Sequence, residues 1–165
     1  MVDKNDSKGK AVITQEGLKR MEAQLEHYVS VRRNEIADQI AIARGFGDLS
    51  ENAEYDEAKK EQAKLEEEII RLENTIRTAV VISEEDITTE YVGVGTRVKV
   101  KDFASGDTDT YTIVGAQEAN PYEGRISNES PVGSALIGSQ IGDKVSVDVP
   151  VGQITLEILS IDRHL

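Results

Sequence analysis

The most constraining feature of this sequence is a mirrored arrangement of apolar residues about Gly47. On both sides of this glycine, apolar residues recur at spacings of three and four, which is the period of one face of an α-helix. The matching positions are Leu18, Met21, Leu25 and Tyr28 before it, and Leu65, Ile69, Leu72 and Ile76 after it. The pattern therefore predicts a long antiparallel helical hairpin that reverses at Gly47.

Local signals place the ends of the two helices. Thr14 is a natural N-cap, so the first helix should run from there to about Ala43, a length of roughly 40 Å. Glycines at positions 45 and 47 should end it, and the second helix should cover about Leu49 to Ala79. Most of the surface of these helices is charged, so only their narrow apolar stripes can hold them together. In this register Arg32 should lie opposite Gln62 and form a polar layer of the kind that fixes alignment in coiled coils.

The composition excludes several classes of protein. Among 165 residues there is no cysteine and there are only two histidines, so disulfides and thiolate metal sites are excluded and a zinc site is not expected. The polar N-terminus lacks the apolar core of a signal peptide, and no later run approaches membrane-spanning length. We therefore expect a cytoplasmic protein without a membrane partner, with a disordered tail over residues 1–11.

The charge distribution limits the contacts that each part can make. The formal net charge is −12, of which residues 1–82 carry −4 and residues 83–165 carry −8. Such a chain repels phosphates over roughly 10 Å, so we expect no stable binding of free nucleic acid. Any contact with nucleic acid should come from the hairpin, while the acidic second half is suited to a basic protein surface.

The apolar period changes from about 3.5 to 2 after an acidic linker, and a period of 2 indicates strands. We expect a helical domain at 12–82, a linker at 83–90 and a second domain at 91–165. The expected elements of the second domain are strands at 96–101, 109–114, 124–127, 144–149 and 154–161 and a helix at 130–137. In that helix Ser130 should be the N-cap and Pro131 the first residue. The predicted fold class is α+β, a helical hairpin followed by a small antiparallel sheet with one short helix.

The tip of the hairpin carries the candidate chemistry. Asp48 and Glu51 lie three residues apart, so their carboxylates would share one helical face if the second helix began beside them. Carboxylates without histidine or thiolate suit Mg²⁺, but a Mg²⁺ site needs about six oxygen ligands, so a partner would have to supply the rest. An Asp-x-x-Glu pattern is also a capping box, and from the local pattern alone this is the more common meaning. The run fails as an EF-hand, because Ala53 replaces the required glycine and Lys59 the final glutamate.

Other residues near the tip have less specific interpretations. Arg44 and Lys59 place positive charge on either side of it, where they are either solvated helix surface or phosphate contacts. Asn52 and Tyr55 are candidates for supporting the tip, and Tyr55 more commonly would pack across the hairpin. A half-complete metal site argues against a free-standing nuclease.

The run Ala43-Arg44 followed by Gly47-Asp48-Leu49-Ser50-Glu51-Asn52-Ala53-Glu54-Tyr55 resembles the tip signature of bacterial Gre transcript-cleavage factors of the GreA type. The resemblance extends over residues 12–161. In the second half it is carried by Tyr111-x-Ile113-Val114-Gly115, Glu118-Ala119, Ile126-Ser127, Ser130-Pro131-x-Gly133 and Gly142-Asp143. The chain departs from the family at Gly45, where a larger residue is usual, and at Asn120, where Asp is usual.

This resemblance implies an FKBP-like fold for the second domain, which would dock at the rim of the secondary channel of RNA polymerase. The docking residues that it implies are Ile126, Ser127, Ser130 and Pro131. The hairpin would enter the channel, and the protein, as a monomer, would stimulate the polymerase's own cleavage of the 3′ end of backtracked nascent RNA, rescuing arrested complexes.

The resemblance also implies roles for the tip. Asp48 and Glu51 would help to hold a Mg²⁺ ion shared with the polymerase active centre, and the protein alone would bind no cofactor. Arg44 and Lys59 would belong to a basic patch facing the RNA. Two alternatives are a channel-binding regulator that does not stimulate cleavage and a peptidyl-prolyl isomerase. Intact Asp48 and Glu51 speak against the first, and a scarcity of aromatic residues in the second domain speaks against the second.

Overall fold

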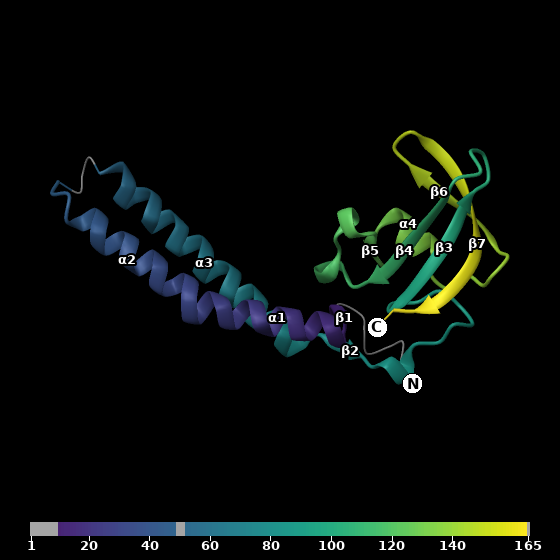
Figure 1. The fold of residues 1–165 in the computed structure, drawn as a ribbon, viewed down its shortest axis with the longest axis horizontal. Coiled ribbons are helices and arrows are strands. Elements are labelled where there is room, and N and C mark those ends of the chain that lie inside the picture. The colour runs from purple at the N-terminus through teal and green to yellow at the C-terminus, as the bar shows by residue number, and fades with distance from the viewer. Residues whose placement is uncertain (1–9, 49–51, 165) are drawn as a thin grey trace. The chain divides into compact units, whose positions relative to one another are not determined.

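The computed structural model describes residues 10–48 and 52–164 (Figure 1). The chain forms two compact units, one of Lys19–Thr78 and one that joins Met1–Leu18 to Ala79–Leu165. The tail predicted over residues 1–11 lies outside the described residues as far as residue 9. No helix within the described ranges is long and apolar enough to cross a membrane.

The first arm of the hairpin is one continuous helical path from residue 15 to residue 44. It consists of α1 (Gln15–His27), a π-helical turn η1 (Tyr28–Arg32) and α2 (Arg33–Arg44). The predicted helix is confirmed, but the π-helical turn was not predicted. From Tyr28 onward the residues that face the second arm are spaced four apart, at Arg32, Ile36 and Ile40. Four residues of an α-helix turn the chain by about 40° more than one full turn, so the facing positions drift round the helix at each step. The wider π turn absorbs part of this drift and keeps these side chains directed at the second arm.

The second arm is α3 (Ala53–Thr78), which runs antiparallel to α2 (Figure 1). The buried core between the arms consists of Ile36, Ile40, Ala58, Leu65 and Ile69, with Leu25, Tyr28 and Tyr55 packed against it. The predicted start of this helix at Leu49 is wrong, because Asn52 is still non-helical and Ala53 is the first helical residue. Asp48 therefore lies five residues before the helix, so the condition that the second helix begins beside it is not met.

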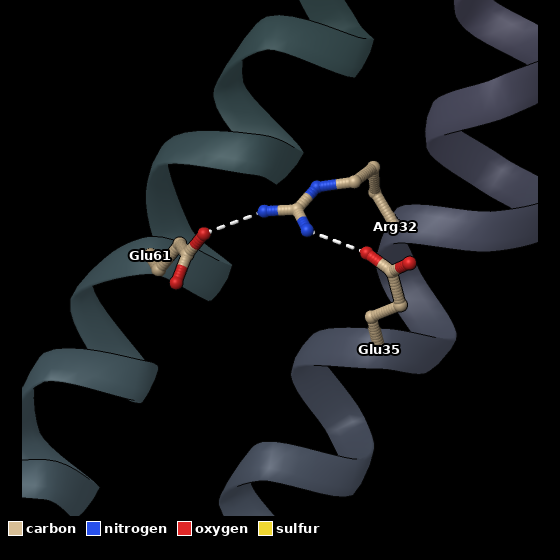
Figure 2. Close-up of polar contacts among 3 residues, drawn as sticks. All are labelled: Arg32, Glu35 and Glu61. Atoms are coloured by element: carbon tan, nitrogen blue, oxygen red, sulfur yellow. Dashed lines mark hydrogen bonds and ion pairs between the residues drawn. The ribbon is translucent and has the colours of Figure 1, made fainter.

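Arginine–glutamate pairs align the two arms. Arg32 donates from Nη2 to Glu61 Oε1 on the opposite arm at 2.6 Å, and it also contacts Glu35 on its own arm (Figure 2). Arg33 makes two parallel bonds to Glu66, from Nε and Nη2, both at 2.7 Å. The predicted polar layer at Arg32 is thus present, but its partner is Glu61 and not Gln62. Successive arginines reach two glutamates five residues apart on α3, which fixes the register of the hairpin.

The Arg33–Glu66 pair gives a prediction about pH. The hydrogen bonds from Arg33 lower the pKa of the Glu66 carboxyl below its usual value of 4.5. A pKa that is lower in the folded state means that the pair stabilises the hairpin above the unfolded pKa and loses this effect as the pH falls. Glu66→Gln should therefore lower the melting temperature slightly at pH 7, and parent and variant should converge as the pH falls below about 4. Thermal unfolding at several pH values measures this, with the exposed Glu67→Gln as the matched control; a difference that persists at pH 2 would contradict it.

The second unit is built on a five-stranded sheet in the order β5-β4-β3-β7-β6. The strands are β3 (Thr96–Asp102), β4 (Thr108–Val114), β5 (Arg125–Ser127), β6 (Lys144–Val149) and β7 (Gly152–Arg163). The short helix α4 (Pro131–Leu136) is capped by Ser130 as predicted, since Gly133 N–H donates to Ser130 Oγ at 3.0 Å. The core comprises Val92, Val98, Val100, Ile113, Leu136, Val147, Leu156, Ile158 and Ile161. The five strands expected from the sequence are therefore present, with ends that differ from the expected ones by at most two residues.

The sheet is mixed, although three of its four strand pairs are antiparallel as expected. The fourth pair, β4 with β5, is parallel, with Thr112 opposite Arg125 and Val114 opposite Ser127. Between these strands the chain passes through two short 3₁₀ turns, η3 (Ala116–Glu118) and η4 (Pro121–Glu123). This crossover brings the chain back beside the middle of β4, at Thr112, before β5 begins. β5 can therefore run in the same direction as β4.

A small two-stranded sheet, which was not predicted, lies at the root of the hairpin. Here β1 (Val12–Thr14) pairs in parallel with β2 (Val80–Ile82), and a 3₁₀ turn, η2 (Glu84–Asp86), follows within the predicted linker. Thr14 caps α1 as predicted, because Gly17 N–H donates to Thr14 Oγ1 at 3.0 Å.

A buried glutamate supports this cap from a distant part of the sequence. Glu118, only 7% exposed, accepts hydrogen bonds from Thr14 N–H at 2.8 Å and from Thr14 Oγ1 at 2.6 Å. A carboxylate is favoured at this place because the N-terminus of a helix carries partial positive charge. The approach is so close that a Cβ on Gly17 would lie 2.1 Å from Glu118 Oε1. The start of α1 is therefore anchored on η3.

Candidate functional site

The reversal at the tip is closed by backbone bonds at the end of α2. Gly45 N–H donates to Ile42 O at 3.0 Å and Phe46 N–H to Ala43 O at 3.2 Å, which ends the helix. Gly47 has φ of +101°, in the left-handed region that favours glycine, whereas Gly45 at φ −67° remains right-handed. Of the two predicted helix-breaking glycines, only Gly47 is required by its backbone conformation.

Asn52 is the N-cap of α3. Its Oδ1 accepts a hydrogen bond from Tyr55 N–H at 3.1 Å, and its carbonyl accepts the first helical bond, from Asp56 N–H at 3.2 Å. The alternative that Asp48 caps this helix as part of a capping box is therefore wrong, since Asp48 lies five residues before Ala53.

Asp48 is exposed and borders an open hollow at the end of the hairpin. The hollow, of about 480 Å³, is lined by Phe46, Asp48, Asn52, Ala53 and Glu54. Glu51 lies outside the described residues, so its position relative to Asp48 stays a prediction. Glu54 was not considered from the sequence, although its place two residues after the cap directs it to the same hollow as Asp48. The tip thus presents carboxylates in a setting open to solvent and to a partner.

The residues of this tip fit Mg²⁺ chemistry only in part. Carboxylate and amide oxygens are the donors that Mg²⁺ prefers, and two carboxylates and one amide border the hollow. Within residues 10–48 and 52–164, no three acidic or histidine side chains come together in a group that could hold a metal ion. A site here would need ligands from Glu51, from a partner or from both.

The two predicted basic residues lie on one flank of the hairpin. Arg44 directly follows the buried Ala43, and Lys59 directly follows the buried Ala58. Each lies about 100° further round its helix than a core alanine, and in antiparallel helices these two positions fall on the same side of the pair. Both side chains are exposed, and Lys59 Nζ donates to Gln62 Oε1 at 2.7 Å.

The other flank is acidic. It holds a groove of about 310 Å³ lined by Gln39, Ile42, Ala43, Glu54, Glu57, Ala58 and Glu61. Phosphate would be repelled by this flank and attracted by the flank that carries Arg44 and Lys59. The hairpin therefore has two electrostatically different sides near its tip.

The second candidate segment, Ile126 to Pro131, forms the turn from β5 into α4. Ser127 O accepts from Ser130 Oγ at 2.7 Å, and Ser127 Oγ accepts from Glu129 N–H at 3.0 Å. Ile126 packs against the core and Pro131 is exposed. The structure therefore brings these four residues together at a sheet edge, where their internal bonds give the segment a fixed form.

Tyr55 packs against the hairpin core, as its simpler interpretation predicted. Next to the sheet-edge segment, the completely exposed Tyr122 was not singled out from the sequence. An aromatic residue after proline in a short polar loop was the only signal that could have indicated it.

Two family models match the chain in succession, and both describe transcription elongation factors. The model "Transcription elongation factor, N-terminal" matches residues 11–81, and "Transcription elongation factor, GreA/GreB, C-term" matches residues 87–163. Transcription elongation factor GreA of Alkaliphilus oremlandii is 53% identical over 152 residues, which cover 92% of this chain and 96% of that protein. The same identity and coverage are found for transcription elongation factor GreA of Clostridioides difficile.

Among solved structures, GreA factor homolog 1 (Gfh1) of Thermus thermophilus is 30% identical and aligns over 92% of this chain and 98% of that one, with a TM-score of 0.42. The two family models and the identities to the two GreA proteins establish the family. The chain belongs to the GreA/GreB family of transcription elongation factors, and it is a factor that acts on transcription, not a free-standing enzyme.

Proposed function

We propose that this protein binds bacterial RNA polymerase, inserts the hairpin through the secondary channel and stimulates the polymerase's intrinsic cleavage of backtracked RNA. Family membership supports the partner, and the single observation that carries the mechanism is the composition of the tip. Asp48 is exposed on a hollow at the end of the hairpin, while Asn52 fulfils the capping role that would otherwise explain an acidic residue there.

In this proposal Asp48 and Glu51 contribute ligands to a Mg²⁺ ion that is shared with the polymerase active centre. A divalent ion supplies an activated water and stabilises charge on the reacting phosphate. The carboxylates of the chain complete a coordination shell that neither protein completes alone. Arg44 and Lys59, on one flank, bind phosphates of the extruded RNA, and the acidic flank faces away from them.

We further propose a division of labour between the two parts of the chain. Residues 12–82 carry the chemistry, residues 83–90 connect, and residues 91–165 dock on the polymerase through Ile126, Ser127, Ser130 and Pro131. The fixed turn that these four residues form supports a docking role, because a preorganised surface loses less entropy on binding. The protein acts as a monomer in the cytoplasm, where the polymerase and its nascent RNA are found.

The decisive experiment uses a stalled, backtracked elongation complex with labelled RNA. Adding the purified protein with Mg²⁺ should shorten the RNA from its 3′ end, while the protein alone should leave free RNA intact. Stable binding to the polymerase without shortened RNA would instead support the regulator that does not stimulate cleavage. Cleavage of free RNA by the protein alone would overturn the shared-site mechanism.

A further inference from the structure

We propose that Asn52 is a positioning residue, which ties the end of α2 to the start of α3 and thereby sets the place of Asp48. The inference rests on the proposed function, since it assigns Asn52 to the same reaction. It goes beyond the simple capping role, because a cap serves only one helix. The side chain of Asn52 is bonded to both.

Two hydrogen bonds of opposite polarity carry this inference. Asn52 Nδ2 donates to Ala43 O at 2.6 Å, and Asn52 Oδ1 accepts from Tyr55 N–H at 3.1 Å. The first bond satisfies a carbonyl at the C-terminal end of α2, and the second satisfies an N–H in the first turn of α3. Helix ends leave such groups without intrahelical partners, so one side chain here completes two helices at once.

The amide is the functional group that this geometry requires. It carries a donor and an acceptor in one rigid plane, whereas an ionised carboxylate can only accept. Serine also caps helices well, but its hydroxyl is one bond from Cβ and too short to bridge to the facing arm. Asp and Ser are both good N-caps, so these two replacements keep the bond to Tyr55 and remove the bond to Ala43.

The bridge closes the loop that contains Asp48. Ala43, which is 3% exposed, and Asn52, which is half-buried, bracket the reversal, while Phe46 within it is 68% exposed. Phe46 therefore buries little apolar surface, and the polar bonds at the base of the loop hold the described residues between Ala43 and Asp48 in place. The Ala43 carbonyl accepts both Phe46 N–H, from inside the loop, and Asn52 Nδ2. A change at Asn52 therefore acts on the backbone that leads to Asp48.

The test compares Asn52→Ser and Asn52→Asp with the parent protein in the cleavage assay. Misplacing a reacting group by about 1 Å can cost up to about 100-fold in rate, so we expect both variants to lower the maximal cleavage rate by about tenfold or more. The concentration of factor that gives half-maximal cleavage should change less than about twofold, because the docking surface is untouched. Helix content by circular dichroism should stay the same, because the cap is retained.

A matched control is available in the same hairpin. Asn34 Nδ2 donates to Ser30 O at 2.8 Å, a bond of the same chemical kind that lies within one arm. Asn34→Ser should cleave like the parent protein. Serine is neutral but smaller than asparagine, and aspartate has the shape of asparagine but carries a charge. A loss of cleavage rate in both Asn52→Ser and Asn52→Asp is therefore explained by the missing Nδ2 donor and not by size or charge alone.

The possible outcomes separate this inference from the proposed function. If Asn52→Ser and Asn52→Asp cleave at the parental maximal rate, Asn52 is only a helix cap and the inference is overturned. If the two Asn52 variants only need a higher concentration of factor and reach the parental maximal cleavage rate, the positioning role of Asn52 is overturned as well. If the parent protein and Asn34→Ser both fail to stimulate cleavage, the proposed function falls, and the inference with it.

Discussion

Replacing Asp48 with Asn and Glu51 with Gln together should abolish stimulated cleavage while leaving the protein folded and able to occupy the polymerase channel. The substitutions keep the shape of both side chains but remove the negative charge that Mg²⁺ requires. Because Asn52 and not Asp48 caps α3, the free energy of unfolding should change by no more than about 0.5 kcal/mol. The measurement is RNA shortening in backtracked complexes, with competition against the parent protein as the measure of binding.

The matched control for this double variant is Asp56→Asn with Glu67→Gln, which removes two exposed charges from α3 away from the tip hollow. It should cleave like the parent protein. Raising the Mg²⁺ concentration should partly restore the single variants, because a weakened site fills by mass action. Parental cleavage by the tip double variant at low Mg²⁺ would contradict a ligand role for both carboxylates.

The largest expected effect on stability is that of Gly115→Ala. A Cβ at this position would lie 1.7 Å from the backbone oxygen of Val12, so the main chain itself would have to move. Val12 is held in β1 by its pairing with Val80, and residue 115 immediately precedes the turn that carries Glu118. We expect a loss of about 3 kcal/mol or more, which is typical of severe overpacking. Thermal or urea unfolding followed by circular dichroism measures it.

Gly93→Ala is the appropriate control for this change. Neither glycine has positive φ, but a Cβ on Gly93 would meet nothing within 4 Å. Removing a glycine without a clash restricts the unfolded chain, so this variant should be neutral or more stable by up to about 1 kcal/mol. Equal stability of the two alanine variants would show that the root of the hairpin adapts to the extra methyl group.

The elements with a sustained local period were predictable from the sequence. The mirrored apolar stripes predicted the hairpin and its reversal at Gly47, and the period-2 pattern predicted β3, β4, β6 and β7. Burial alternates along β3 and β6, whereas Thr112, Ile113 and Val114 at the end of β4 are all buried. The residue types next to each helix start were also sufficient to predict the two N-caps, Thr14 on α1 and Ser130 on α4. In each case the signal lies within a few residues, because helical and extended backbones have fixed periods of their own.

Contacts between distant residues were decided only by the tertiary structure. The three-residue strands β1 and β2 are too short to show a period, and they form because the two ends of the hairpin meet. The bonds of Glu118 to Thr14 and of Asn52 to Ala43 join residues 104 and 9 positions apart, and neither side chain has a local pattern that names its partner. The sequence by itself determined which residues stand at the tip. The packing of one helix end against the other decided that Asn52, and not Asp48, is the N-cap of α3.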